Sequence, residues 1–282
     1  MRLAESSEEQ RGTIDHLVHA FVPATADVST HKVPGGNPCL LKILSQPPSE
    51  SAPAATGLTL CRSWASQAPD ESFITVQCFT PGGRAIDCCG HGLLVAGHTW
   101  LDRLQRNELF LSMNGSAVKC WRQKGVTWLQ FERIRTRRCL PPEWLRTIFP
   151  DQPQAVEAAS CGDQRGYLVV QWPDDFDLKR LSPPDERLSN WSQRAIICTA
   201  AQPSTGTDAI TLRYFAPQYG VVEDTATGSA LRVLADYWSQ RFAHITAVQC
   251  SPTGGQLLAA ITSDHVEIGG RCVTVQAKAN ND

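Results

Sequence analysis

Two short stretches of the sequence combine acid–base side chains with a glycine-rich backbone. Residues 88–100, CCGHGLLVAGHTW, place His91 between two glycines at the start of an apolar run. Residues 223–229, EDTATGS, place Asp224 shortly before Gly228 and a second apolar run. Removing a proton from the carbon next to a carboxylate requires a positioned base and hydrogen-bond donors aimed at the charge that develops. The two stretches together supply both, with His91 and Asp224 as the acid–base groups.

Both of these residues also have a structural interpretation. A histidine at a helix entrance could simply hydrogen-bond a loop, and an aspartate is a favoured helix cap. Asp224 lies four residues before Gly228, which is too far for a simple cap. Glycines flank His91 on both sides, and glycine lets a ligand approach the backbone closely. We therefore favour a functional role for both residues.

The two stretches share a layout that divides the chain into similar halves. Both follow a Phe-x-Pro landmark, Phe79-Thr80-Pro81 and Phe215-Ala216-Pro217, and the landmarks lie about half a chain length apart. Both end in a Trp-containing pattern that is apolar on more than one helix face, which is typical of a buried helix. Each helix would leave unpaired N–H groups and the positive end of its dipole at its start. Two such starts that face each other across a cleft make a receptor for a small carboxylate.

The rest of the chain reads as many short strands, which are separated by turn signals such as VPGGNP and TPGGR. This pattern predicts an α+β fold of curled sheets rather than a parallel α/β sheet. We expect a flexible polar tail at 1–12, a first barrel-like domain at 13–132 and a second barrel-like domain at 133–264. A last strand within about 265–282 is a candidate to return and pair with the first domain.

Composition excludes several classes of partner and site. The formal net charge of −2 gives no reason to expect a nucleic acid or an anionic membrane, and the basic run RIRTRR (133–138) is interpreted as a solvated connector. No run approaches the roughly 18 apolar residues of a membrane span. The start lacks the apolar core of a signal peptide, which predicts a cytoplasmic protein. The 11 cysteines include no CxxC pair, which indicates reduced thiols and no structural metal.

Three segments together resemble the PhzF-like family of phenazine biosynthesis: PGGNPCLLKIL, CFTPGGRAIDCCGHGLLVAGH and RYFAPQYGVVEDTATGSALRVLADY. The family is related to diaminopimelate epimerase and proline racemase, and its motifs keep their order from about residue 14 to about residue 276. The resemblance implies a diaminopimelate-epimerase-like α+β fold with two pseudo-symmetric halves, each a barrel-like sheet around a central helix. It also implies a homodimeric, cofactor-independent isomerase of secondary metabolism, which transfers a proton on a small carboxylated substrate bound between the halves.

The resemblance assigns roles to individual residues. His91 matches the histidine of the family's CGH motif, and Asp224 matches the acid of its ED-P-ATGS motif, in which Thr225 replaces the usual proline. The start of the second helix matches a cradle for the substrate carboxylate. The residues that match substrate-binding positions are Asn37, Gly90, Gly92, Thr227, Gly228 and Ser229.

One departure from the family pattern concerns the general base. In the family, a glutamate of a Ser-Glu-Thr motif lies between the GNP and FTP segments, and in this chain the interval reads TLCRSWASQAPDESFITV. A match without gaps puts Gln67-Ala68-Pro69 over the motif, which leaves the base missing. With a gap, Glu71 becomes the candidate catalytic acid, and its competing interpretation is an exposed turn carboxylate.

A thiol mechanism is the competing chemistry. Cysteine-dependent racemases place one thiol on each face of the substrate, and Cys89 matches the first position. The second position is Thr227, whose hydroxyl is far too weak an acid to replace a thiol. We therefore expect no two-thiol racemase, and we expect Cys88 and Cys89 to be small buried residues at the helix entrance.

Three functions are consistent with these observations. The first is a PhzF-like isomerase that shifts a proton or a double bond. The second is a divergent cyclase or lyase of the same family, in which the loss of the usual glutamate accompanies different chemistry. The third is a non-catalytic binder of small molecules. A carboxylate from residues 63–72 in the cleft would favour the first function over the other two.

Overall fold

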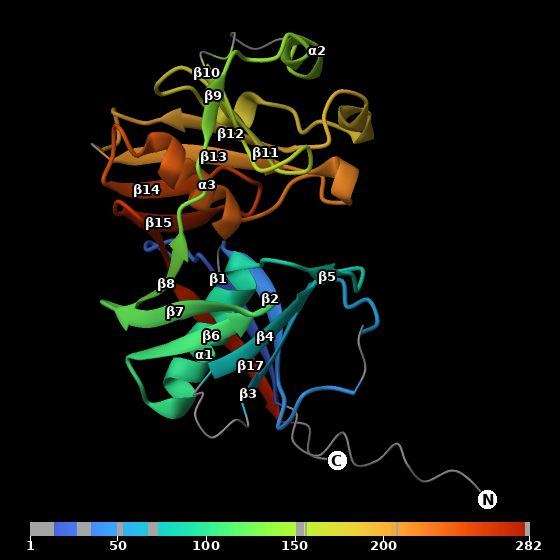
Figure 1. Cartoon of the computed structure of the whole chain (residues 1–282), viewed down its shortest axis with the longest axis vertical. Coiled ribbons are helices and arrows are strands. Elements are labelled where there is room, and N and C mark those ends of the chain that lie inside the picture. Colours follow the sequence, from blue (N-terminus) through green and yellow to red (C-terminus); the bar gives the residue numbers. More distant parts are fainter. Residues whose placement is uncertain are drawn as a thin grey trace, which may run out of the picture.

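The computed structural model describes residues 14–26, 35–49, 53–66, 73–150, 155, 157–206 and 208–279. The first half contains β1 (Ile14–Ala20), β2 (Asn37–Ile43), β3 (Thr59–Ala65), β4 (Phe73–Phe79), β5 (Ala85–Ile86), α1 (Gly90–Leu104), β6 (Glu108–Met113), β7 (Ser116–Gln123) and β8 (Val126–Glu132). Figure 1 shows this half as the lower lobe, in blue and green, with the second half above it.

The second half adds short helical turns to the same kinds of strand. Its elements are β9 (Arg137–Cys139), α2 (Leu145–Ile148), β10 (Glu157–Cys161), β11 (Tyr167–Gln171), η1 (Leu178–Arg180), η2 (Glu186–Asn190), β12 (Ala195–Ala201), β13 (Ala209–Phe215), η3 (Pro217–Tyr219), α3 (Gly228–Trp238), β14 (His244–Gln249) and β15 (Gly255–Ile261). The described chain ends with β16 (His265–Gly270) and β17 (Cys272–Ala279). None of the helices in these ranges is both long and apolar enough to cross a lipid bilayer.

The strand pairing of the first half is repeated, step by step, in the second. From β1 to β4 the pairs are antiparallel, parallel and antiparallel, then β4 pairs with β6 in parallel and β6, β7 and β8 are antiparallel. The series from β10 through β16 has the same order of directions. In both series the long helix follows the fourth strand, so α3 corresponds to α1. This repeat confirms the predicted pseudo-symmetric halves.

Two continuous stretches cross from one half to the other. β8 pairs with β16, and the chain then continues from β8 into β9, which pairs with β10 of the second half. The last stretch runs in the opposite direction, because β16 is followed by β17, which pairs with β1. Figure 1 shows β17, in red, among the blue strands of the lower lobe. The halves are therefore joined by two crossing segments rather than by one flexible linker.

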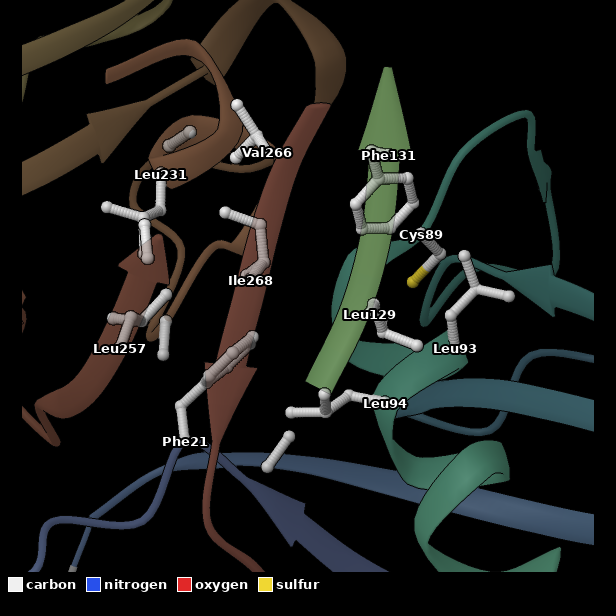
Figure 2. Close-up of a cluster of buried hydrophobic side chains, with 14 of the residues drawn as sticks. Phe21, Cys89, Leu93, Leu94, Leu129, Phe131, Leu231, Leu257, Val266 and Ile268 are labelled. Carbon is white, nitrogen blue, oxygen red and sulfur yellow. The ribbon is translucent and has the colours of Figure 1, made fainter. Parts of the chain in front are cut away.

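A hydrophobic core spans both halves and holds the two long helices inside their sheets. Leu93, Leu94 and Val95 of α1 and Leu231, Val233 and Leu234 of α3 are at most 1% exposed. Figure 2 shows Leu129 and Phe131 of β8 beside Val266 and Ile268 of β16, between Leu93 of α1 and Leu231 of α3. Because burial of apolar surface drives this packing, each helix is fixed with its amino-terminal end toward the junction.

The basic run at residues 133–138 lies in the first crossing segment, where acidic partners engage it. Asp236 of α3 accepts from the Arg133 Nη2 at 2.8 Å and from the Thr136 backbone N–H at 2.8 Å. Arg138 forms an ion pair with Glu157 of β10. These charges tie the crossing segment to the second half.

Candidate active site

The starts of the two long helices touch at the centre of the molecule. A Cβ added to Gly90 would lie 3.3 Å from the Gly228 Cα, and one added to Gly228 would lie 3.4 Å from the Gly90 Cα. The residues before them, Cys89 and Thr227, have nearly the same extended backbone, with φ −120° in both and ψ of 94° and 100°. Neither side chain caps its helix. The first-turn N–H groups of both helices are therefore left for other acceptors.

A cavity of about 270 Å³ lies at this contact. From the first half it is lined by Thr59, Thr80, Pro81, Arg84, Ile86, Cys88, Cys89, Gly90 and His91. From the second half it is lined by Tyr167, Tyr214, Ala216, Tyr219, Val221, Asp224, Thr227, Gly228 and Ser229. The site is thus built from segments of both halves that lie far apart in the sequence and meet where the two helix starts touch.

Most of the predicted site residues that the structure describes meet at this cavity, and two of these described residues do not line it. His91, Asp224, Gly90, Thr227, Gly228 and Ser229 are all among the lining residues. Asn37 lies behind the wall and contacts Asp224. Gly92 packs against the core instead, because a Cβ at this position would lie 2.4 Å from the Cys78 Sγ. Gly92 therefore serves close packing of α1 against β4 rather than the cavity surface.

The Asp224 carboxylate is held on both oxygens by donors. Its Oδ1 accepts from the Asn37 Nδ2 at 3.0 Å and from the Thr225 N–H at 2.9 Å, and its Oδ2 accepts from the Thr227 Oγ1 at 2.6 Å. Gln249 of β14 completes the network, because its amide donates to the Asp224 carbonyl and accepts from the Thr227 N–H. The carboxylate is fixed in orientation, which suits a residue that orients its neighbours and supplies a negative charge.

His91 has one ring nitrogen engaged and one free. Its Nδ1 lies 3.5 Å from the Cys89 Sγ, and its Nε2 has no hydrogen-bond partner in the part of the chain that the structure describes. The side chain is 8% exposed. Burial disfavours the imidazolium form, but the hydrogen bond with the Cys89 sulfur and the negative charge of Asp224 favour it, and the pKa of His91 lies above its ordinary value. The Nε2 is therefore the nitrogen that can exchange a proton with a bound ligand.

The two cysteines at the helix entrance differ in exposure. Cys89 is buried, as predicted, and its pKa is raised well above the ordinary range, first by its hydrogen bond with Cys78 and then by burial. Cys89 is therefore a neutral thiol rather than a thiolate at neutral pH. Cys88 is exposed, and the prediction of a buried residue was wrong. It precedes the extended residue that leads into α1, so its side chain faces away from the core that Cys89 enters.

The segment that carries the candidate base Glu71, with Gln67-Ala68-Pro69, lies outside the described residues. The strand ends that flank it are paired with each other, with Ala65 opposite Ile74. Among the described residues of β3, Thr59 lines the cavity, at the other end of the strand. Six strand steps separate Thr59 from Ala65, which is roughly 20 Å. Among the described residues that line the cavity, Asp224 is the only carboxylate.

Tyrosines that sequence reasoning missed form much of the second-half wall. The Tyr167 and Tyr214 rings lie 6.4 Å apart between centroids, and Tyr219 follows in η3. Burial raises the pKa of Tyr167, and its hydrogen bond with the Ser229 hydroxyl acts in the opposite direction. These side chains give the cavity flat, neutral walls that end in hydroxyl groups. Tyr214 adjoins the second Phe-x-Pro landmark, which is the one signal in the sequence that points to it.

Comparisons with known proteins agree with this architecture. The family model for phenazine biosynthesis-like proteins matches residues 66–278. An uncharacterized isomerase of Vibrio cholerae is 33% identical over 198 residues, which cover 66% of this chain and 67% of the relative. A mouse phenazine biosynthesis-like domain-containing protein is 31% identical, over 70% of this chain and 74% of the relative.

Solved structures show the same fold at lower identity. A PhzF-family protein of Enterococcus faecalis superposes with a TM-score of 0.76 at 22% identity, over 94% of this chain and 97% of its own. A hydroxyproline epimerase of Agrobacterium vitis superposes with a TM-score of 0.55 at 10% identity, over 96% of this chain and 93% of its own. The family match, the relatives and the repeated halves lead to one assignment. The chain belongs to the phenazine biosynthesis-like, or PhzF-like, family.

Proposed function

We propose that the protein is a cofactor-independent isomerase that moves a proton on a small carboxylated metabolite bound between the two helix starts. The observation that carries the proposal is the free Nε2 of the buried His91 in the cavity where α1 and α3 meet. A buried polar atom without a partner is costly unless a ligand satisfies it. Several relatives are named uncharacterized isomerases, which supports the same reaction class.

The metabolite's carboxylate is expected at the helix starts. The first-turn N–H groups of α3 and α1 and the positive ends of both helix dipoles converge on the contact between Gly228 and Gly90. The Ser229 hydroxyl adds one more donor at the same place. Donors placed in this way also stabilise the additional negative charge that develops on the carboxylate when the adjacent carbon loses a proton.

His91 is then the group that carries the proton. Its Nε2 removes a proton from the carbon beside the carboxylate, so a C–H bond breaks, an N–H bond forms and the electron pair spreads over the carboxylate as an enolate. The fixed negative charge of Asp224 stabilises the imidazolium that results. The imidazolium N–H exchanges with solvent while the enolate is bound and then delivers a proton to another carbon of the conjugated system, which restores neutral His91 and yields the isomer.

A single proton carrier restricts the reaction. Inversion of a stereocentre requires one group on each face of the substrate, whereas a shift of a double bond requires one group on one face. Inversion would therefore require another acid–base group besides His91. Among the described residues that line the cavity, Asp224 is held by three donors and Cys89 is a neutral thiol, so neither is free to take that role. This favours a proton shift on one face over racemisation.

The test measures solvent deuterium incorporation by NMR for a panel of β,γ-unsaturated carboxylic acids and cyclic amino acids. Wild type should incorporate deuterium and shift the double bond of at least one ligand. His91→Gln should slow both processes by roughly 10²–10⁴-fold, and the exposed His244→Gln is the matched control. Product without incorporation would support the cyclase or lyase instead. Bound ligands that show neither product nor incorporation would support a non-catalytic binder.

A further inference from the structure

We propose that the metabolite carries a second anionic group, a carboxylate, which Arg84 binds at the mouth of the cavity. The inference rests on the proposed function, because it takes the first carboxylate to lie at the helix starts. Among the described residues that line the cavity, Arg84 is the only lysine or arginine, and Asp224 is the only acid.

The charge of Arg84 has no counterion within the described chain. Several other arginines of the structure are paired with acids, such as Arg213 with Glu223 and Arg241 with Asp174. Among the described residues, Arg84 has no acidic partner in an ion pair, and its side chain makes one hydrogen bond, from Nη2 to the Tyr219 carbonyl at 2.8 Å. A guanidinium presents a planar fork of donors that matches a carboxylate, and most of this fork is left open.

The acid that lines the cavity is not free to serve as that counterion. Both oxygens of Asp224 are engaged by Asn37, Thr225 and Thr227, which fix the carboxylate toward the wall formed by β2 and the start of α3. The cavity therefore presents an uncompensated positive charge at its mouth and converging backbone donors at its floor. A ligand with a negative group at each end complements both.

Arg84 is presented by a rigid turn rather than by a loose loop. The Thr80 N–H donates to the Arg84 carbonyl at 2.7 Å, and the Arg84 N–H donates to the Thr80 hydroxyl at 3.1 Å. Between them, Gly83 has a φ of +84°, which favours glycine, and a Cβ there would lie 2.7 Å from the Pro53 carbonyl oxygen. The contact with Tyr219 comes from the opposite half. Both ends of the side chain are thus held in place before a ligand binds, which lowers the entropy cost of using it.

The cavity volume restricts the size of the ligand. About 270 Å³ is at the small end for a binding pocket. Two anionic groups joined by a short chain or one ring fit this volume, whereas a nucleotide does not. The chemical class is therefore a small dicarboxylate with an acidic C–H beside the carboxylate at the helix starts.

The experiment compares matched acids by isothermal titration calorimetry. The dicarboxylates from succinate to adipate are each titrated against the monocarboxylate of the same chain length. Wild type should bind the best dicarboxylate at least about tenfold more tightly than its monocarboxylate. Arg84→Gln should remove that preference by weakening dicarboxylate binding toward the affinity of the monocarboxylate, and Arg84→Lys, which keeps the charge but not the fork, should keep part of it. The exposed Arg106→Gln is the matched control.

The outcomes separate this inference from the proposed function. Equal affinity for both kinds of acid, or a preference that persists in Arg84→Gln, would overturn the role of Arg84 and leave the helix-start carboxylate site standing. If no acid of either kind binds wild type, the proposed function fails, and the inference fails with it. Raising the ionic strength should weaken binding of the dicarboxylate more than binding of the monocarboxylate, because salt screens the charge of the exposed Arg84.

Discussion

Asn37 of β2 donates one hydrogen bond to the Asp224 carboxylate at 3.0 Å and another to the Ala226 carbonyl at 2.8 Å. Both bonds use the same amide nitrogen, and both reach from the first half to the connection that leads into α3. Asn37 is 6% exposed, so little water competes for these bonds. The residue thereby fixes the orientation of the acid that faces His91 and clamps the two halves beside the cavity.

Asn37→Asp should be destabilising because it replaces the donor with a second carboxylate beside Asp224. Loss of a buried hydrogen bond costs about 1–3 kcal/mol, and the repulsion adds to it. The loss of unfolding free energy relative to wild type should shrink as the pH falls from about 7 to about 4, because the introduced carboxyl group can donate a hydrogen bond once it is protonated. Urea unfolding at several pH values measures this change. The exposed Asn107→Asp is the control, and a deficit that does not vary with pH would contradict the role of the clamp.

Asp224→Asn should lower the pKa of His91. The negative charge of Asp224 favours the imidazolium, and the substitution removes that charge with almost no change in size. NMR titration of the His91 ring in wild type and variant measures the shift, and the limb of the deuterium-exchange profile that follows His91 should move to lower pH with it. The exposed Asp163→Asn controls for a general change of net charge. An unchanged His91 titration would show that the two side chains are not coupled.

The stability of the protein should also depend on pH through His91. Its pKa in the folded chain lies above the ordinary value of 6.5 that it takes in the unfolded chain. Protonation therefore favours the folded state. The stability contributed by His91 protonation is fully present below about pH 6.5 and is lost as the pH rises through the pKa of His91 in the folded chain. The difference in free energy of unfolding between wild type and His91→Gln should follow this course, and a difference that grows with pH would contradict it.

The layout of the site was largely predictable from local sequence. Each Phe-x-Pro landmark, glycine-rich entrance and apolar helix lies within one short stretch, and a buried helix start that bears glycine presents donors whatever surrounds it. The repetition of this stretch also predicted that the halves would be similar. These features depend on neighbours in the chain, which a single sequence displays.

The parts that were missed depend on contacts between distant segments. Gln249 is fully buried and connects Asp224 to Thr227, yet it lies at the end of β14 with no local signal. Arg84 acquires its place only when the turn after β4 meets Tyr219 of the other half. The error at Cys88 has a similar origin, because periodicity does not reveal which of two adjacent residues turns inward before a helix starts.

The cysteines should differ sharply in reactivity. Cys88 and Cys139 are exposed, whereas Cys89 and its neighbours Cys61 and Cys78 are buried. The thiol pKa is raised in all five, so access to the reagent separates the two groups. Iodoacetamide at about pH 8 should therefore label the first two in the folded protein and the others only after unfolding. Mass spectrometry of the peptides identifies the labelled cysteines.

Cys89→Ser should keep most of the deuterium exchange, since a hydroxyl can still contact the His91 Nδ1. Complete loss in that variant would favour a thiol mechanism.

Gly92→Ala should destabilise the protein, although alanine is the better helix former by about 1 kcal/mol. The new methyl group would lie 2.4 Å from the Cys78 Sγ and 3.1 Å from the Cys89 Sγ, and overpacking of this kind costs about 1–3 kcal/mol. Gly82→Ala is the matched control, because a Cβ there meets only the Thr80 Oγ1, at 3.9 Å.

Removing the sulfur that Gly92 accommodates should relieve this strain. In Gly92→Ala/Cys78→Ala the nearest part of residue 78 becomes its own Cβ, 3.7 Å from the new methyl group. The double variant should therefore be more stable than the sum of the single changes, with a favourable interaction of about 1–2 kcal/mol in a double-mutant cycle. If the effects of the two single substitutions on stability were strictly additive, the whole of α1 would have moved to relieve the clash, and the methyl group would not press on Cys78. In that case ligand binding at Gly90 should weaken in Gly92→Ala, because the helix start moves with the rest of the helix.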